Sequence, residues 1–164
     1  MAQQDVQVED IDFALAAWRE EGVWSVSTLP ARLVCSMDTL SMALRQLPGE
    51  GGVYGFVGLN EDCLLIFHQS PAGLRAVVSN AAAIDDWDLA EQALQFTGAV
   101  AEDSEEWDEF TAVGQLSILT DLGVDTDELA DLLEDEDLYP DEQVAAIAER
   151  AGFAQQVAEI LGDD

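Results

Sequence analysis

The stretch GVYGFVGLNEDCLLIFHQSPAGLRAVVS, residues 52–79, decides the fold of this chain. Its runs at 52–59, 63–69 and 74–79 are rich in apolar and β-branched residues, which is typical of strands. The links NED and SPAG are good turn sequences. Because links this short join only antiparallel neighbours, the stretch predicts a three-stranded meander.

The segments on either side of the meander predict further strands and helices. IDFALAAW (11–18) and VWSVSTL (23–29) are typical of strands, and REEG between them of a hairpin turn. SMDTLSMALRQLPG (36–49) predicts a helix capped by Ser36, and DDWDLAEQALQFTG (85–98) a helix that begins at Asp85. The fold class is therefore expected to be α+β, with an antiparallel five-stranded sheet and helices in ββ-α-βββ-α order. This order resembles the roadblock and profilin-like folds.

The rest of the chain is predicted to form a small all-helical C-terminal region. QLSILTDLGV (115–124) ends in a Gly-Val pair typical of a helix C-terminus, and DTDELADLL (125–133) offers Asp125 as a cap. PDEQVAAIAERAGF (140–153) has Pro140 in its first turn, and AQQVAEILG (154–162) follows as a last helix. We expect an α+β domain at 11–98, an acidic linker at 99–109 and a helical region at 110–162.

The charge of the chain argues against several classes of partner. There are 35 acidic residues against 5 basic ones, a net charge of −30. Residues 97–164 hold 21 of the acids and only Arg150, a net of −20. Such a surface repels phosphate backbones and anionic lipids, so we expect no direct nucleic-acid binding and no membrane binding. A basic protein partner fits the sign of the charge, and an N-terminus without signal-peptide features predicts a cytoplasmic protein.

No motif in the sequence predicts a catalytic, cofactor or metal site. Loops that begin at Asp125 or Asp135 lack the ligand spacing and glycine of a calcium-binding EF-hand. Cys35 and Cys63 are isolated, which favours small buried cysteines over zinc ligands. His68 has no nucleophile arranged beside it, so a surface or structural histidine is expected. Paired carboxylates can perform acid–base chemistry, but among 35 of them sequence proximity identifies no pair.

The acidic stretch LLEDEDLYPDEQ, residues 132–143, is the best candidate for a partner surface. Tyr139 lies there in a polar turn, where charge alone does not explain an aromatic residue. Trp107 lies in the similarly acidic DSEEWDEF (103–110). Exposed aromatic side chains often anchor interfaces. The candidate interface residues are Trp107, Asp137, Tyr139, Asp141 and Glu142.

Several segments together resemble the family of tRNA adenosine deaminase-associated proteins, from about residue 12 to residue 153. They are DFALAAWREEGVW, LRQLPGEGGVYGFV, DDWDLAEQAL, LSILTDLG and LYPDEQVAAIAERAGF, in this order and spacing. The family takes its name from gene neighbourhood with the tRNA adenosine deaminase. The resemblance implies a bacterial cytoplasmic protein and carries over no catalytic residue. The chain is not the deaminase itself, whose zinc chemistry needs the H-x-E and P-C-x-x-C motifs that this sequence lacks.

Two hypotheses about function remain open. In the first, the protein is a non-enzymatic accessory protein whose acidic C-terminal helices dock on a basic surface, of the tRNA adenosine deaminase or of another basic protein. In the second, the acidity is only solvent adaptation, and the sheet makes a homodimeric roadblock-like scaffold. An enzyme would need a concave pocket with a buried carboxylate of shifted pKa, or with His68.

Overall fold

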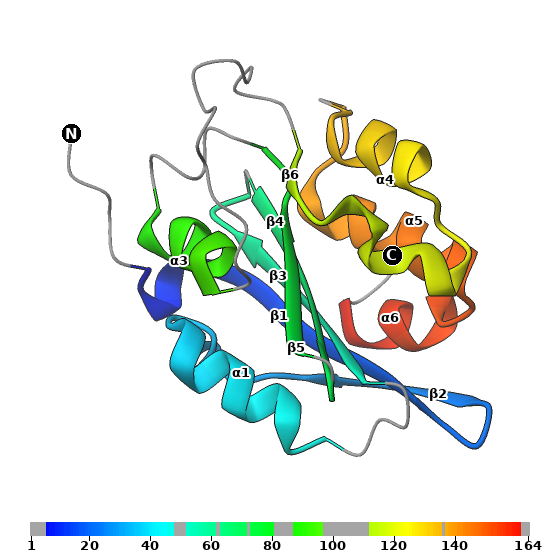
Figure 1. Ribbon diagram of the computed structural model, residues 1–164, viewed down its shortest axis with the longest axis horizontal. Coiled ribbons are helices and arrows are strands. Elements are labelled where there is room, and N and C mark those ends of the chain that lie inside the picture. Colours follow the sequence, from blue (N-terminus) through cyan, green and yellow to red (C-terminus); the bar gives the residue numbers. More distant parts are fainter. Residues whose placement is uncertain are drawn as a thin grey trace.

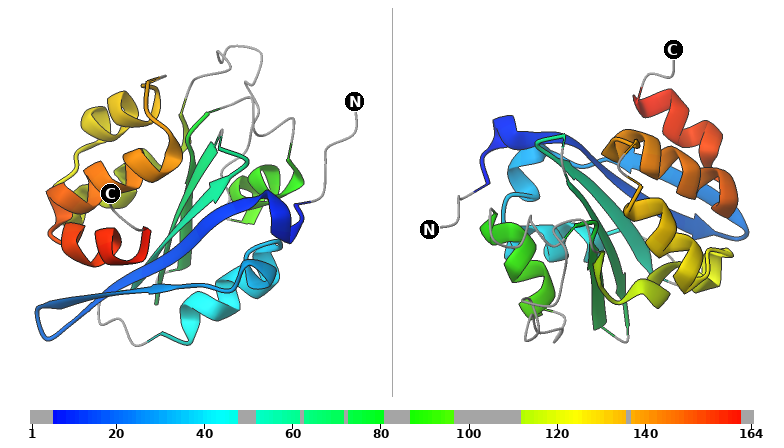
Figure 2. Two further views of the ribbon diagram at one scale, coloured as in Figure 1. Left: turned by 180° about the vertical axis from the view of Figure 1, so that it is seen from behind. Right: turned by 90° about the horizontal axis from the view of Figure 1, so that it is seen from above.

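The fold is an antiparallel sheet between two layers of helices (Figures 1 and 2). The computed structural model describes residues 6–47, 52–61, 63–71, 73–80, 87–96, 112–135 and 137–161. In this part of the chain the sheet has six strands in the order β2-β1-β3-β4-β5-β6. The strands are β1 (Ile11–Glu20), β2 (Val23–Thr28), β3 (Val53–Leu59), β4 (Cys63–Ser70), β5 (Gly73–Val78) and β6 (Val113–Gly114).

The centre of the sheet is the predicted meander of β3, β4 and β5. Val57 lies opposite Leu65, and Phe67 lies opposite Ala76, in antiparallel register. β1 pairs with β3 on the other side, and β2 with β1. Every residue of β3 is buried, because each face of the sheet packs against helices.

The sheet has six strands, whereas the sequence predicts five. The sixth, β6, lies in the C-terminal region that is predicted to be all-helical, so that prediction is wrong at this point. Val113 and Gly114 of β6 lie opposite Val78 and Val77 of β5. Gly114 has a φ of 124°, and a Cβ atom there would stand 2.4 Å from the Ala76 carbonyl oxygen. Only glycine allows this approach. A strand of two residues is too short to show the alternation by which strands are recognised in sequence.

One face of the sheet is covered by α1 (Met37–Arg45) and α3 (Asp88–Phe96). The short 3-10 helices η1 (Val8–Asp10) and η2 (Ala31–Leu33) precede and follow the first hairpin. The Ser36 hydroxyl accepts a hydrogen bond from the Thr39 N–H, which confirms the predicted cap of α1. Asp85, predicted to begin the second helix, lies outside the described residues. Cys63 is fully buried in the core between these helices and the sheet. Cys35 is partly buried and packs against the same core.

The other face is covered by η4 (Leu116–Leu122), α4 (Thr126–Leu133), α5 (Pro140–Ala151) and α6 (Ala154–Leu161). The segment 116–122 is a 3-10 helix, and Gly123, with a φ of 92°, ends it. The Asp125 carboxylate accepts the Glu128 N–H at 2.8 Å, which confirms the predicted cap of α4. These helices share one hydrophobic core with the sheet, which includes Phe56, Ile66, Leu129, Ile147 and Phe153.

The predicted linker, 99–109, and Trp107 within it lie outside the described residues. The division into units at 11–98 and 110–162 therefore stays a prediction. Among the helices that the structure describes, none combines the length and the apolar character needed to cross a bilayer.

Candidate protein interface

Tyr139 is the last residue of the connection between α4 and α5, and its side chain lies at the surface. The residue is the N-cap of α5, with an extended backbone, and its N–H donates to the Glu142 carboxylate at 2.9 Å. Pro140 follows at the first helical position, where its fixed φ suits a helix start. Tyr139 is nonetheless 62% exposed. Its backbone is thus held by the helix start, while its ring is available to a partner.

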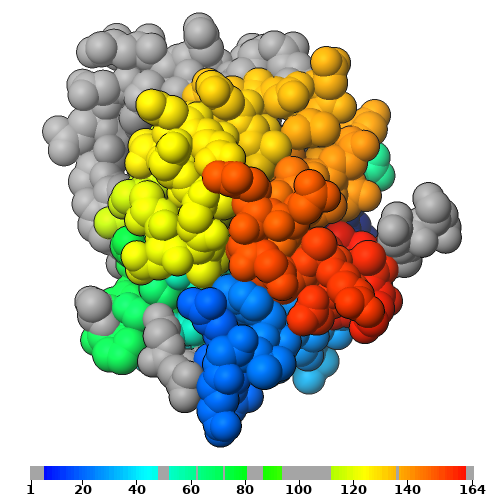
Figure 3. All heavy atoms as spheres, turned by 90° about the vertical axis from the view of Figure 1, so that its right-hand side faces the viewer, coloured from blue at the N-terminus to red at the C-terminus, as the bar shows by residue number. Residues whose placement is uncertain are grey.

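Two hollows flank Tyr139, and Glu61 and Pro140 line both of them. The first, called here the β1 hollow, has a volume of about 430 Å³, and its lining also includes Asp12, Phe13, Asp141 and Leu161. The second, called here the α4 pocket, has a volume of about 260 Å³. Its lining also includes Leu133, Glu134, Asp135, Leu138 and Gln143. Figure 3 shows the face of the molecule formed by η4 to α6, in yellow to red.

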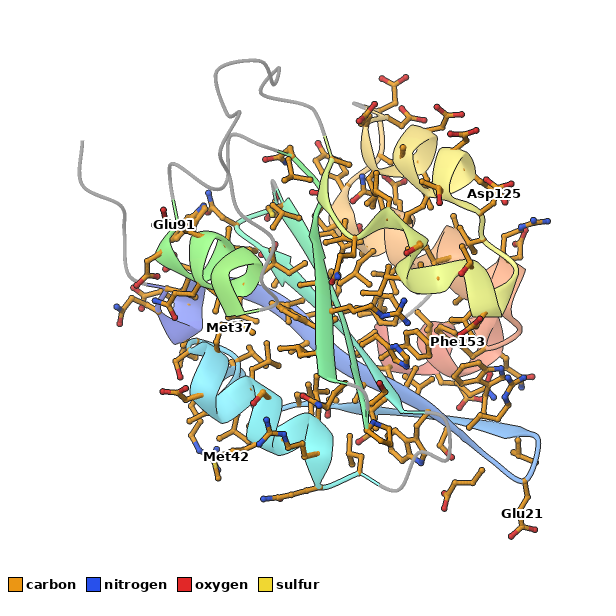
Figure 4. The ribbon with its side chains drawn as sticks, in the orientation of Figure 1. Glu21, Met37, Met42, Glu91, Asp125 and Phe153 are labelled. Carbon is orange, nitrogen blue, oxygen red and sulfur yellow. The ribbon has the colours of Figure 1, made fainter. Side chains whose placement is uncertain are left out.

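The charged residues that line the two hollows are all acidic. Asp12 comes from β1 and Glu61 from the β3–β4 turn, and Glu134 and Asp135 directly follow α4. Glu61 has a left-handed backbone with a φ of 56°, and its N–H donates to the Asp12 carboxylate. Carboxylates that are far apart in sequence therefore line the same hollows as the exposed Tyr139. In Figure 4, further carboxylates, including the labelled Asp125, extend outward from the α4 layer.

The structure brings some of the predicted interface residues to these hollows and leaves others outside their lining. Tyr139 and Asp141 line the β1 hollow. Glu142 is exposed and holds the Tyr139 N–H, whereas Asp137 is exposed and donates its N–H to the Asp135 carboxylate. Trp107 lies outside the described residues. Whether these residues bind a partner stays a prediction.

Sequence reasoning missed Asp12, Glu61 and Gln143 as part of this surface. Asp12 and Glu61 meet only because β1 pairs with β3, where Ile11 lies opposite Leu59. Nothing local marks Asp12 or Glu61, since each belongs to an ordinary strand or turn pattern. Gln143 was placed inside the acidic stretch, but its burial was not foreseen.

His68 lies in a buried aromatic cluster rather than at this surface. Its ring stacks on Tyr54, with ring centroids 4.2 Å apart and planes 12° apart. Its Nδ1 lies 2.9 Å from the Arg75 guanidinium, which only donates, so Nδ1 accepts this bond. Trp24 and Phe153 extend the cluster, with ring centroids 4.7 Å apart. His68 is 4% exposed and is thus a structural histidine, one of the two predicted alternatives.

Burial shifts the pKa values of two side chains, Tyr54 and Cys35. Burial raises the pKa of the Tyr54 phenol above its ordinary value, and nearby Asp121 raises it further. Burial also raises the pKa of the Cys35 thiol, with a smaller contribution from Asp10. A raised thiol pKa disfavours the nucleophilic thiolate. Within the described residues, no group of three or more His, Cys, Asp or Glu side chains is arranged to hold a metal ion.

Comparison with known proteins gives one family and a curated relative. Residues 12–154 match the family described as Rv3753c-like tRNA adenosine deaminase-associated protein. Protein Rv3753c of Mycobacterium tuberculosis (strain ATCC 25618 / H37Rv) is 34% identical over 151 residues, which cover 91% of this chain and 87% of that protein. No solved structure matches the chain.

Proposed function

The chain belongs to the Rv3753c-like tRNA adenosine deaminase-associated family, as its sequence resemblance predicted, and on this premise we propose a non-enzymatic accessory role. In this proposal the acidic C-terminal helices dock on a basic protein surface. A cytoplasmic location is part of the proposal. The family description names an association with the deaminase, which makes that enzyme the first partner to test.

The observation that carries the proposal is Tyr139, an aromatic side chain that is 62% exposed and stands among carboxylates. Interfaces typically derive most of their binding energy from a few central aromatic or arginine anchors. Charges around such an anchor mainly raise the association rate and select the partner. A protein that binds tRNA presents a basic surface for it, because phosphate contacts come largely from Lys and Arg. The tRNA-binding face of the deaminase is therefore the complementary surface we propose.

The test measures binding of the purified full-length chain to the tRNA adenosine deaminase of the same organism. Affinity is compared at about 0.1 M and about 1 M NaCl, between which the Debye length falls from about 10 to about 3 Å. We expect a complex that weakens by about tenfold or more at high salt. If no salt-sensitive complex forms at micromolar concentration, the proposal is refuted.

A substitution pair locates the surface. Tyr139→Ser should weaken the complex by about tenfold or more, equivalent to about 1.4 kcal/mol. Met42→Ser is the matched control, because Met42 is 55% exposed on α1, in the helical layer on the other face of the sheet. An equal loss in both variants would show that the complex does not use the Tyr139 surface.

A homodimeric scaffold is the second candidate. Helices pack on both faces of the sheet in the described residues, so a second copy could pair with the sheet only at an edge, and β2 is the longer of the two edge strands. Val23 at the start of β2 is 66% exposed. Edge strands present backbone groups on which another chain can add a strand. Light scattering that gives a strict monomer at micromolar concentration would exclude this candidate.

A further inference from the structure

We propose that two copies of this chain pair through their β2 strands, in antiparallel orientation and centred on Ser27. The inference rests on the second candidate function, the homodimeric scaffold, and adds to it the register and the contacting residues. The β1–β2 hairpin provides the surface, and it extends beyond the helices at one end of the molecule (Figures 1 and 2). Figure 4 labels Glu21 in the turn of this hairpin.

The first argument is that one side of β2 has open backbone groups. The Leu29 N–H donates to the Ala14 carbonyl at 2.9 Å, and this pair continues the register between β1 and β2. Backbone groups alternate in direction along a strand, so those of Ser27 also face β1, whereas those of Val26 and Thr28 face away from it. Among the described residues, only the neighbouring Ser27 hydroxyl bonds to these outward groups, at the Thr28 carbonyl.

The second argument is the absence of acidic side chains from this edge. Residues 22–37 contain no acidic residue, and Arg32 is their one charged side chain. The strands β4 and β5 also lack acids, but they lie inside the sheet, whereas β2 is at its edge. Edge strands are usually protected by charged side chains, proline or a bulge. Between Val23 and Thr28, β2 has none of these, so it is an edge open to another strand.

The charge also favours a second copy of the chain as the occupant. Two chains of net charge −30 repel each other, so close contact is favoured where their surfaces carry no acids. A basic protein is matched better by the acidic helices than by a neutral strand. Identical strands that pair antiparallel are related by a two-fold axis. Each copy uses its β2 edge once, so the assembly closes as a dimer.

A contact from α6 sets the register. Gln156 donates from its Nε2 to the Trp24 carbonyl at 3.2 Å, and this carbonyl belongs to the outward set of β2. A register centred on Val26 would require the same carbonyl to accept the Thr28 N–H of the second copy. A register centred on Ser27 avoids Trp24, because it pairs Val26 of each copy with Thr28 of the other.

The first test is disulfide cross-linking of the full-length chain at micromolar concentration, with oxidised glutathione. In the proposed register the two Ser27 residues are a pair without shared hydrogen bonds, whose Cα atoms lie about 4.5 Å apart, which a disulfide can span. Ser27→Cys should therefore form a covalent dimer.

The matched control is Ser25→Cys, on the same face of β2. In this register the two Ser25 positions lie about 13 Å apart, too far for a disulfide. The unsubstituted chain, with Cys35 and Cys63, gives the background. We expect cross-linking of Ser27→Cys to be at least tenfold faster than that of the control or the unsubstituted chain.

A second pair of variants tests the outward N–H of Thr28 by sedimentation equilibrium. Thr28→Pro removes this donor but leaves the bonds between β1 and β2, because proline is tolerated in an edge strand where its nitrogen faces outward. Thr28→Val keeps the N–H and has a side chain of similar size. We expect Thr28→Pro to raise the dissociation constant of the dimer at least tenfold and Thr28→Val to change it less than threefold. Circular dichroism checks that both variants fold, and the cross-linking test does not depend on them.

Equal cross-linking of Ser27→Cys and Ser25→Cys, or equal dissociation constants of the two Thr28 variants, would refute pairing through β2. If light scattering still shows a dimer in that case, the scaffold candidate stands and only the β2 contact is refuted. A strict monomer refutes both. The deaminase complex is measured at the Tyr139 surface, so its outcome is independent of all of these.

Discussion

The two tyrosines of the chain lie in opposite surroundings. Tyr54 is 6% exposed, stacks on His68, and has Arg19 and Arg75 among the charges that act on its phenol. Tyr139 is 62% exposed, and the charged residues that share its two hollows are carboxylates. One tyrosine is fixed by a strand inside the core, and the other by a helix start at the surface.

The difference reflects the position of two of the few positive charges in the molecule. The chain has only 5 basic residues. Arg75 bonds to His68, and Arg19 lies over the Trp24 ring at 5.1 Å, both beside the Tyr54 cluster. The turn between α4 and α5 receives none of them among the residues that line its hollows. A basic partner would therefore meet only carboxylates among the charged residues that line these hollows.

The largest expected effect tests the packing of the Tyr54 cluster. Phe153 is fully buried, with its ring centroid 4.7 Å from Trp24 and 6.1 Å from Phe56, and Figure 4 labels it in the layer beside the sheet. Phe153→Ala should lower the free energy of unfolding by about 3–5 kcal/mol, because it leaves a cavity among aromatic rings. Urea denaturation measures the loss, with the milder Phe153→Leu as control. A loss of less than about 1 kcal/mol would contradict a tightly packed cluster.

A smaller effect concerns Arg150, the one basic residue in 97–164. Its guanidinium pairs with the Glu128 carboxylate at 2.8 and 3.0 Å and donates to the Gly123 carbonyl at 2.9 Å. The two side chains are 57% and 38% exposed, so solvent screens the pair. Arg150→Gln should cost about 0.5–1 kcal/mol in urea denaturation, and less at high salt.

The control for Arg150 is Arg32→Gln. This substitution removes the same charge from the exposed Arg32 of η2, which has no ion pair among the described residues. If both variants lose the same stability, the effect comes from net charge and not from the contact between α4 and α5.

The next prediction uses the pKa of Tyr54. Burial raises this pKa in the folded protein, and the unfolded chain keeps the ordinary value near 10. The neutral phenol is thus preferred by the fold, and its contribution to stability is fully present below pH 10. It is lost as the pH rises from the unfolded pKa through the folded one. Tyr54→Phe should therefore flatten the fall in unfolding free energy above pH 10, and an unchanged slope would be evidence against the buried phenol.

The smallest expected effect is that of Tyr139→Ser on stability. The N–H of residue 139 still donates to Glu142 after the substitution, and little buried surface is lost. The free energy of unfolding should change by no more than about 0.5 kcal/mol, measured by urea denaturation beside Phe153→Ala. A loss comparable to that of the Phe153 variant would mean that Tyr139 supports the fold and is not kept free for binding.

Much of the fold follows from local sequence chemistry. Ser36, Asp125 and Gly123 cap or end their helices as predicted, because capping needs only a few neighbouring residues. The strands between 11 and 79 were recognisable because each is long and apolar enough to show a pattern. β6 was not, since its pairing depends on the close approach of Gly114 to β5, which no local pattern records.

The candidate surface was only partly predictable, for a physical reason. Tyr139 stood out because it is an aromatic residue in an acidic turn. Asp12 and Glu61 join it through strand pairing, and the burial of Gln143 depends on where α5 packs. Such convergence is a property of tertiary structure, and composition alone indicated just the sign of the charge.

The short strand β6 also bears on how this chain can be divided. Residues 112–161 add a strand beyond β5 and fill one face of the sheet that residues 6–80 build. A fragment that stops at residue 98 would therefore expose that face, including Phe56 and Ile66, and aggregate. If the chain is divided between residues 97 and 111 and the two fragments are produced together, we expect them to reassemble into one sheet. The protein is thus suited to fragment complementation, in which recovery of the sheet reports that the two halves have met.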